Sequence, residues 1–160
     1  MPDLSLTRSR DDRRLYELDG VGTLRFERGL GARRATARAG DRTWRMKTSF
    51  WRRAVAATDE AGAVVGTFDP RALRRGGALR WGGRELQLRP ASAWRERYAL
   101  ADGDRELALL DARTWGKQPV RISIEDLGDV EPALLLFAIW VVRMLAHDSA
   151  AAGGTAAATG

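Results

Sequence analysis

Cysteine is absent from this chain of 160 residues, and histidine occurs only once, at His147. Without cysteine the chain has no disulfide, no thiolate metal site and no cysteine nucleophile. Because the single histidine follows the last apolar run, catalytic triads that use histidine and metal sites built from several histidines are excluded as well. We therefore expect no metal centre and no cofactor.

Lysine is scarce too, since Lys47 and Lys117 are the only two among the 27 basic residues. With 21 acidic residues the formal net charge is +6. This charge is unevenly spread, because residues 1–100 carry a net charge of +10 and residues 101–160 one of −4. The asymmetry favours approach to an anionic surface, either phospholipid headgroups or nucleic acid. The alternative interpretation is an arginine-rich surface that is simply well solvated.

Long hydrophobic runs are also missing. Residues 1–15 are polar and charged, and they lack the apolar stretch of a signal peptide. The one strongly apolar run, 133–142, has ten residues, whereas a bilayer span needs about 20. We therefore expect a cytoplasmic protein without a transmembrane span, whose contact with a membrane would be peripheral.

Between Tyr16 and Asp126 the sequence alternates apolar and polar residues with a period of two, as in Leu24-Arg25-Phe26. Such alternation is typical of strands that are buried on one face. Glycine and aspartate separate these segments and suit tight hairpin turns, for example at 59–62 and 101–104. About 10 to 12 strands with no helix between them indicate an antiparallel sandwich or barrel.

The segment from Pro132 to about residue 146 differs because it is apolar on every side of a helical wheel. Proline suits the first turn of a helix, and Glu131 before it suits the positive end of the helix dipole. In a chain of strands, a helix that must be buried on all sides has its natural place inside a closed barrel. The sequence therefore predicts a mainly β fold with one α-helix.

This combination resembles the tubby C-terminal-like superfamily, which includes tubby domains, phospholipid scramblases and LURP-one-related proteins. The similar features are a strand-turn-strand unit at 54–66 and again around 98–104, Trp115 before the strand at 120–124, and the helix at 132–145. The resemblance implies a closed antiparallel barrel of about 12 strands around a buried C-terminal helix. We expect this barrel to span residues 15–148 with its helix at about 132–146. A flexible N-terminal segment, 1–14, and a disordered tail, 149–160, would flank it.

Two groups of basic residues are candidate sites for an anionic headgroup. Arg45 and Lys47 share the outward face of one predicted strand, and Trp51 lies near them in the sequence. Cations that converge near an aromatic ring suit a phosphorylated headgroup. The alternative for residues on a strand is a solvated barrel exterior. The alternative for residues in a connection is that arginine occurs there only because the whole chain is rich in it. The first group is Arg42, Arg45, Lys47, Arg52 and Arg53, and the second is Arg71, Arg74 and Arg75.

Other motifs have structural interpretations. The acidic run 102–111 lacks the glycine of a calcium loop, because Leu107 occupies that position, and it fits a hairpin turn better. Most of the six tryptophans are expected in the core. Acidic residues around 126–131 suit the start of a helix, and a filled barrel leaves no cavity for a substrate. Catalysis is therefore not expected.

The resulting expectation is a non-catalytic binding or scaffold module. Tubby domains bind phosphoinositides through basic surface residues, so the resemblance implies peripheral association with anionic phospholipid headgroups. The cysteine-rich and membrane-spanning features of scramblases are missing, and lipid scrambling is not carried over. A protein–protein interaction module with an unidentified partner is the alternative, and nucleic-acid binding is a third, less favoured hypothesis.

Overall fold

The structure, a computed structural model, describes residues 3–27, 33–48, 55–70, 76–92, 94–112 and 119–158, with side chains as far as residue 148. Its strands form a closed antiparallel barrel in which each strand pairs with its neighbours in the sequence and β1 pairs with β12. The strands are β1 (Asp3–Arg8), β2 (Leu15–Leu18), β3 (Gly22–Phe26), β4 (Arg34–Ala39), β5 (Arg42–Thr48), β6 (Val55–Thr58), β7 (Val64–Pro70), β8 (Gly77–Trp81), β9 (Arg84–Pro90), β10 (Arg97–Asp102), β11 (Arg105–Ala112) and β12 (Val120–Ile124).

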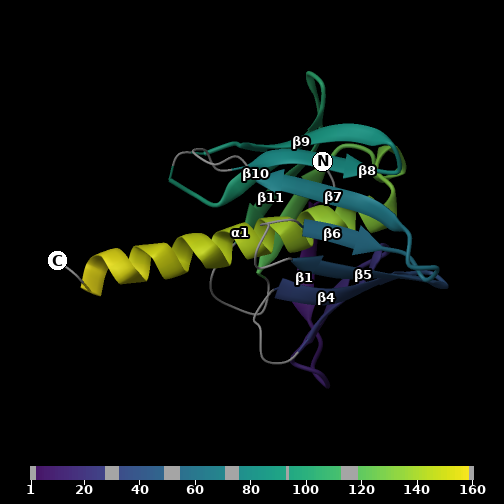
Figure 1. Cartoon of the computed structure of the whole chain (residues 1–160), viewed down its shortest axis with the longest axis horizontal. Coiled ribbons are helices and arrows are strands. Elements are labelled where there is room, and N and C mark those ends of the chain that lie inside the picture. The colour runs from purple at the N-terminus through teal and green to yellow at the C-terminus, as the bar shows by residue number, and fades with distance from the viewer. Residues whose placement is uncertain are drawn as a thin grey trace.

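The helix α1 (Pro132–Ala158) follows a short 3₁₀ helix, η2 (Leu127–Asp129), and runs through the barrel. Figure 1 shows it entering among the strands and projecting beyond them toward the C-terminus. Every residue from Leu134 to Val142 is fully buried. The predicted barrel around a buried C-terminal helix is therefore confirmed. In the part of the chain that is described, no helix has the length and apolarity needed to cross a membrane.

The N-terminal segment corrects one prediction. Residues 3–8 form β1 and close the barrel, whereas the sequence analysis expected residues 1–14 to be flexible. In β1 the apolar residues Leu4 and Leu6 alternate with Ser5 and Thr7, and Leu6 is fully buried opposite Val120. The same period of two that predicts the other strands is present here, and pairing with β2 and β12 satisfies edges that would otherwise stay open.

The C-terminal end of α1 is a second correction. The helix continues to Ala158, whereas the sequence analysis placed its end near residue 146 and expected a disordered tail at 149–160. Alanine is the strongest helix former, and six of the residues at 149–158 are alanines. The helix propensity of alanine therefore extends α1 beyond the barrel, so this segment continues the helical turns that are buried before it.

The helix packs most closely against β3 and β4, because the inward-facing residues of these strands are small. Ala35 and Ala37 point into the barrel on β4, and Gly22 begins β3. A Cβ at Gly22 would lie 2.2 Å from the carbonyl oxygen of Arg38 and 3.0 Å from Cδ1 of Leu136 on the helix. Only glycine fits there, so the close approach of α1 to this side is built into the sequence.

The two ends of the barrel differ in their connections. At the turn end, where β12 ends and α1 begins, short connections link the strands: 19–21, 40–41, 59–63, 82–83, 103–104 and 125–131. Gly40 and Gly103 have φ values of +61° and +60° there, which glycine adopts without strain. At the opposite end, the exit end, α1 leaves the barrel. The described parts of the connections there include 9–14, 91–92 and 94–96.

A cationic face on strands β3 to β5

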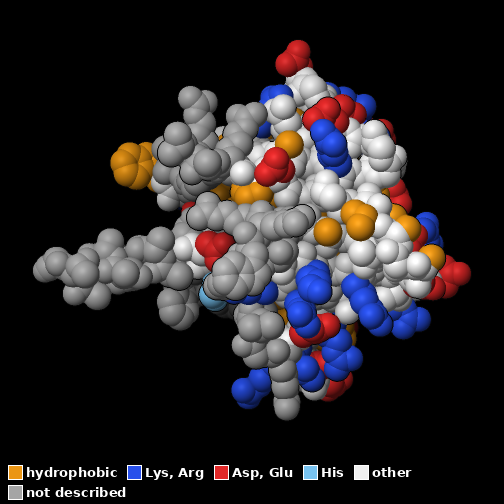
Figure 2. Space-filling model, in the orientation of Figure 1, with side chains coloured by type: hydrophobic (Ala, Val, Ile, Leu, Met, Phe, Trp, Pro, Cys, Tyr) orange, Lys and Arg blue, Asp and Glu red, His pale blue; other side chains and the backbone are white. Residues whose placement is uncertain are grey.

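The outward side of β3, β4 and β5 is rich in basic residues and has no acidic ones within the strands. Their inward residues are apolar, as Leu24, Ala37 and Trp44 show, so the period of two sends the polar residues outward. Figure 2 shows Lys and Arg side chains gathered over β4 and β5 on the face turned to the viewer. We call this surface the cationic face; its basic residues are Arg25, Arg34, Arg38, Arg45 and Lys47.

The register of the strands alternates arginine with threonine across this face. Thr36 lies between Arg25 on β3 and Arg45 on β5. Arg38 in turn lies between Thr23 and Thr43. Directly opposed side chains on a sheet are about 5 Å apart, and like charges there repel each other. Threonine therefore separates most of the cations.

Arg34 and Lys47 are the exception, because they are direct cross-strand partners at the exit end of the cationic face. Neither of them is in an ion pair within the described part of the chain, and the same holds for Arg45. All three side chains belong to exposed residues. Their mutual repulsion is relieved by any anion that binds between them.

The other cations of the face have local partners. Arg25 Nη2 lies 2.7 Å from Oδ2 of Asp12. Arg38 Nε donates a 3.4 Å hydrogen bond to the carbonyl oxygen of Gly40. Among the described residues no carboxylate pairs with Arg38, so four of the five cations of this face are not neutralised by an ion pair there.

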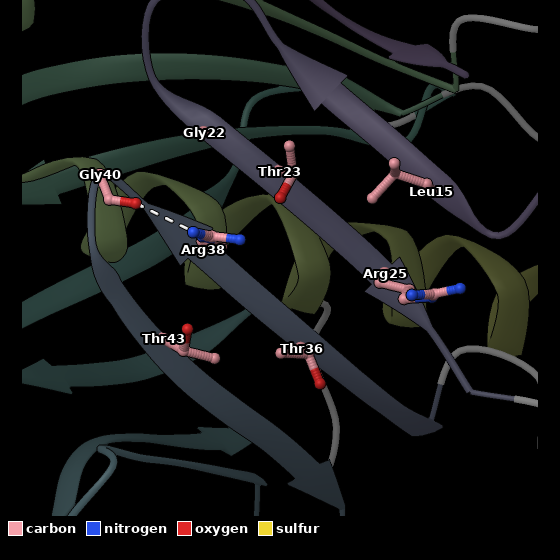
Figure 3. A pocket seen from close by; sticks show the side chains of 8 residues that line it. All are labelled: Leu15, Gly22, Thr23, Arg25, Thr36, Arg38, Gly40 and Thr43. Atoms are coloured by element: carbon pink, nitrogen blue, oxygen red, sulfur yellow. Dashed lines mark hydrogen bonds between the residues drawn. The ribbon is translucent and has the colours of Figure 1, made fainter. Parts of the chain in front are cut away.

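A shallow groove of about 640 Å³ crosses this face. Its lining includes Thr23, Thr36 and Thr43 from three adjacent strands, with Arg25 and Arg38 beside them (Figure 3). Threonine hydroxyls and guanidinium groups are hydrogen-bond donors that suit a phosphate or other oxyanion. A smaller hollow of about 310 Å³ lies beside it, but it contains Asp59 and Glu60 and so is less suited to an anion.

Asp12 limits the charge of the face at its β2–β3 edge. The backbone N–H of Arg14 donates a 2.9 Å hydrogen bond to Oδ1 of Asp12. This hydrogen bond and then the positive charges of Arg25 and Arg14 hold the pKa of the Asp12 carboxyl below its ordinary value of 3.8. Asp12 is therefore ionised at neutral pH and neutralises Arg25.

The structure places two of the sequence-predicted site residues on the cationic face: Arg45 and Lys47. Arg42, which was predicted with them, begins β5 at the turn end on the same side of the strand as Trp44, and its guanidinium lies 5.1 Å from the centre of the Trp44 ring. Arg45 and Lys47 point outward, as predicted. The predicted residues Arg52, Arg53, Arg71, Arg74 and Arg75, and Trp51 beside them, lie outside the described residues. The sequence analysis missed Arg25, Arg34 and Arg38, although the alternation of apolar residues with arginine on β3 and β4 was the signal that locates them.

The tryptophans divide into two kinds. Trp44, Trp81 and Trp140 are buried, which confirms their predicted place in the core. Trp94 is different, since 95% of its surface is exposed in the connection between β9 and β10. Trp115, in the motif that carries part of the family resemblance, lies outside the described residues.

Several of the acidic residues considered for calcium binding or catalysis have structural partners. Asp102 pairs with Arg84 at 2.7 Å, and Asp111 with Arg97 at 3.0 Å. Asp126 caps η2 by accepting a 2.8 Å hydrogen bond from the N–H of Gly128. In the residues that the structure describes, no three acidic or histidine side chains come together to hold a metal ion.

Comparison of the chain with protein-family models, with curated proteins and with solved structures found no match. The cationic face is accordingly interpreted from its own geometry.

Proposed function

We propose that this chain is a non-catalytic module that associates peripherally with anionic phospholipid surfaces through the cationic face of β3 to β5. The observation that carries the proposal is the set of exposed cations on three adjacent strands that contain no acidic residue. Arg34, Arg45 and Lys47 have no carboxylate partner among the described residues, so their charge is available to an external anion.

The shape of the face supports a lipid surface as the partner. A sheet face is broad and rigid, so its cations can contact several headgroups at once. At moderate salt concentration, each Lys or Arg near the surface of an anionic bilayer contributes about 1 kcal/mol to the binding free energy. Three unpaired cations therefore give binding that is weak, reversible and sensitive to ionic strength. The groove lined by threonine and arginine suits the phosphate of one headgroup.

Nucleic-acid binding is less well supported by this face. Proteins that bind single strands combine cations with exposed aromatic rings on which the bases stack. Trp44 is the aromatic residue on β5, and it points into the core rather than to the cationic face. The proposal also includes the resemblance to the tubby C-terminal-like superfamily, which the barrel threaded by a helix supports, and a cytoplasmic location.

The test is co-sedimentation with liposomes of phosphatidylcholine alone and of phosphatidylcholine with 30% phosphatidylserine, at low and at physiological salt. The variant Arg34→Gln/Arg45→Gln/Lys47→Gln removes three positive charges from the cationic face. The control variant Arg80→Gln/Arg89→Gln/Arg121→Gln removes the same charge from exposed residues on β8, β9 and β12.

The expected result is pelleting with anionic vesicles only, loss of most of that binding in the first variant, and retention of most of it in the control. Equal losses in the two variants would mean that net charge alone drives binding, and the face would not be a site. Absence of pelleting with anionic vesicles at both salt concentrations would overturn the proposed function. In that case a soluble oligonucleotide and protein partners become the next probes.

A further inference from the structure

The turn end of the barrel is acidic. Its connections, all of which the structure describes, contain nine acidic residues and no lysine or arginine. Four of these carboxylates, those of Asp19, Asp41, Asp104 and Glu125, have neither a hydrogen bond nor an ion pair in the described part of the chain. The nine residues are Asp19, Asp41, Asp59, Glu60, Asp104, Glu125, Asp126, Asp129 and Glu131.

Cations on the strands offset part of this charge. Arg42 begins β5 beside Asp41, and the guanidinium groups of Arg38 and Arg89 donate hydrogen bonds to the carbonyl oxygens of Gly40 and Gly103. Arg105 begins β11 at the turn end and is paired with Asp129. Arg84 begins β9 there and pairs with Asp102, which ends β10. The free carboxylates remain, so the turn end is repelled by an anionic surface.

The exit end is not acidic in this way, because its described connections have mixed charge: Arg10, Arg13, Arg14, Arg33 and Arg95 with Asp11, Asp12, Glu27 and Glu96. Arg34 and Lys47 form their cross-strand pair there, and Arg10 and Arg13 are exposed in the connection between β1 and β2. None of these four cations is in an ion pair among the described residues. Asp148 is exposed where α1 leaves the barrel, and residues 149–158, which continue α1 at this end, contain no charged residue.

Trp94 adds an apolar group at the same end. The backbone N–H groups of Trp94 and Arg95 lie 3.3 and 3.2 Å from Oγ of Ser92, and these hydrogen bonds hold the bend that presents the indole to solvent. An indole ring prefers the headgroup region of a bilayer, where its apolar body leaves water and its N–H keeps a partner. Neighbouring Arg95 is exposed and suits the phosphates of that region.

These contacts are distributed around the exit end. In the order of strands around the barrel, three strands separate the β4–β5 pair from the β9–β10 pair on one side and five on the other, so Trp94 and the Arg34–Lys47 pair lie on different sides of the helix exit. A surface that meets both groups must face the exit end of the barrel. Contact with the side of the barrel alone reaches one group and leaves the other in water.

We infer that the exit end faces an anionic bilayer, with Trp94 in the headgroup region and the acidic turn end pointing into water. This inference rests on the proposed function and adds to it the orientation of the protein and an apolar anchor. The cationic face then contacts the membrane chiefly through Arg34 and Lys47, the cations at its exit end.

The experiment uses the absence of cysteine in the chain, which allows single cysteines to be labelled with the environment-sensitive fluorophore NBD. In one variant, Trp94→Cys, the NBD label on the cysteine keeps an aromatic group at that position. In the matched control, Val64→Cys, the label lies at the turn end, because Val64 follows the connection 59–63 and is 61% exposed. Both proteins are mixed with vesicles of phosphatidylcholine with 30% phosphatidylserine, with and without lipids that carry a doxyl quencher.

The expected result is a blue shift and doxyl quenching at position 94, with little change at position 64. In unlabelled protein, Trp94→Ala is expected to weaken vesicle binding by about tenfold, and Val64→Ala to leave it within about twofold. If the protein binds vesicles but the label at position 94 stays in water, this orientation is overturned and the proposed function remains intact. Failure of the unlabelled protein to bind anionic vesicles would overturn both.

Discussion

Two sectors of the barrel exterior, the cationic face of β3 to β5 with five basic residues and the sector of β8 to β12 with six, use these residues differently. On β8 to β12 the cations are Arg80, Arg84, Arg89, Arg97, Arg105 and Arg121, and the strands also contain Glu85, Asp102, Glu106 and Asp111. Four of these arginines pair with carboxylates. Among the described residues, Arg25 is the only cation of the cationic face that does so.

The difference between the two sectors distinguishes a high arginine content from a candidate binding site. An arginine-rich sequence places arginine on every side of the barrel, so the number of cations says little about function. The difference lies in the acidic residues, which neutralise one sector and are absent from the strands of the other. A surface is a candidate for binding anions where cations are exposed and carboxylates are missing, and that condition holds on β3 to β5.

The largest expected effect comes from the helix that both sectors enclose. Leu135→Asp places a carboxylate where the side chain is fully buried, in a core whose described residues include no buried polar or charged side chain. We expect a loss of at least about 4 kcal/mol in the free energy of unfolding, enough to prevent folding, because an unpaired charge cannot be buried. Circular dichroism during urea unfolding measures this, with Leu135→Met as the control. A cooperative unfolding transition for Leu135→Asp would contradict the buried position of α1.

The next effect tests whether the cationic face depends on the close approach of α1 behind it. Gly22→Ala puts a Cβ against the backbone of Arg38 and against Leu136, so one of the strands or the helix must move. We expect a loss of about 1–3 kcal/mol in the free energy of unfolding. Thr23→Ala, the neighbouring change on the outward side, is expected to cost less than about 1 kcal/mol. If urea unfolding shows the same loss of unfolding free energy for both variants, the close approach of α1 is not what constrains β3.

A smaller effect compares one arginine from each sector directly. Arg97→Gln breaks the half-buried pair with Asp111, and we expect a loss of about 1 kcal/mol in the free energy of unfolding. Arg45→Gln removes a cation that has no carboxylate partner, so stability should change by less than about 0.5 kcal/mol. For vesicle binding the order is reversed, and Arg45→Gln has the larger effect. The opposite pattern in both assays would remove the distinction between the two sectors.

The smallest expected effect concerns Asp12, the carboxylate that neutralises Arg25. Because the folded protein holds the pKa of Asp12 below 3.8, its ionised form contributes stability above that pH and this contribution is lost as the pH falls through the lowered pKa. The thermal midpoint of Asp12→Asn should therefore lie slightly below that of the wild type at pH 7 and converge with it in acid. A difference that stays constant down to pH 2 would argue against this linkage. The same variant frees Arg25 and should strengthen binding to anionic vesicles.

The sequence predicted the fold well because its two decisive patterns are local. Alternation in segments such as Leu24-Arg25-Phe26 is visible within a few residues, and so is the run from Leu134 to Val142 that is apolar on all sides. The errors fell at the termini. Residues 3–8 show the same alternation, but their burial depends on pairing with β12, more than a hundred residues away.

The candidate site was predicted only in part, for the same reason. Arg45 and Lys47 share one strand, so their common face follows from alternation alone. The partnership of Arg34 with Lys47 depends on the register of β4 against β5, which local patterns do not give. Trp94 lies in a connection, where no periodicity indicates whether a side chain is inside or outside. Its exposure is known only from the fold.

The position of α1 as the last element has a consequence for how the chain reaches this structure. During synthesis all twelve strands leave the ribosome before the helix that fills them. Until Leu134 to Val142 emerge, the inward side chains of the strands have no core to pack on, and the β1–β12 seam must join residues as distant as Asp3 and Ser123. Folding of this kind is dominated by long-range contacts, which makes it slow and leaves apolar strands open to aggregation on the way. The barrel is therefore expected to close only once α1 has been synthesised, with α1 as the template on which the strands assemble.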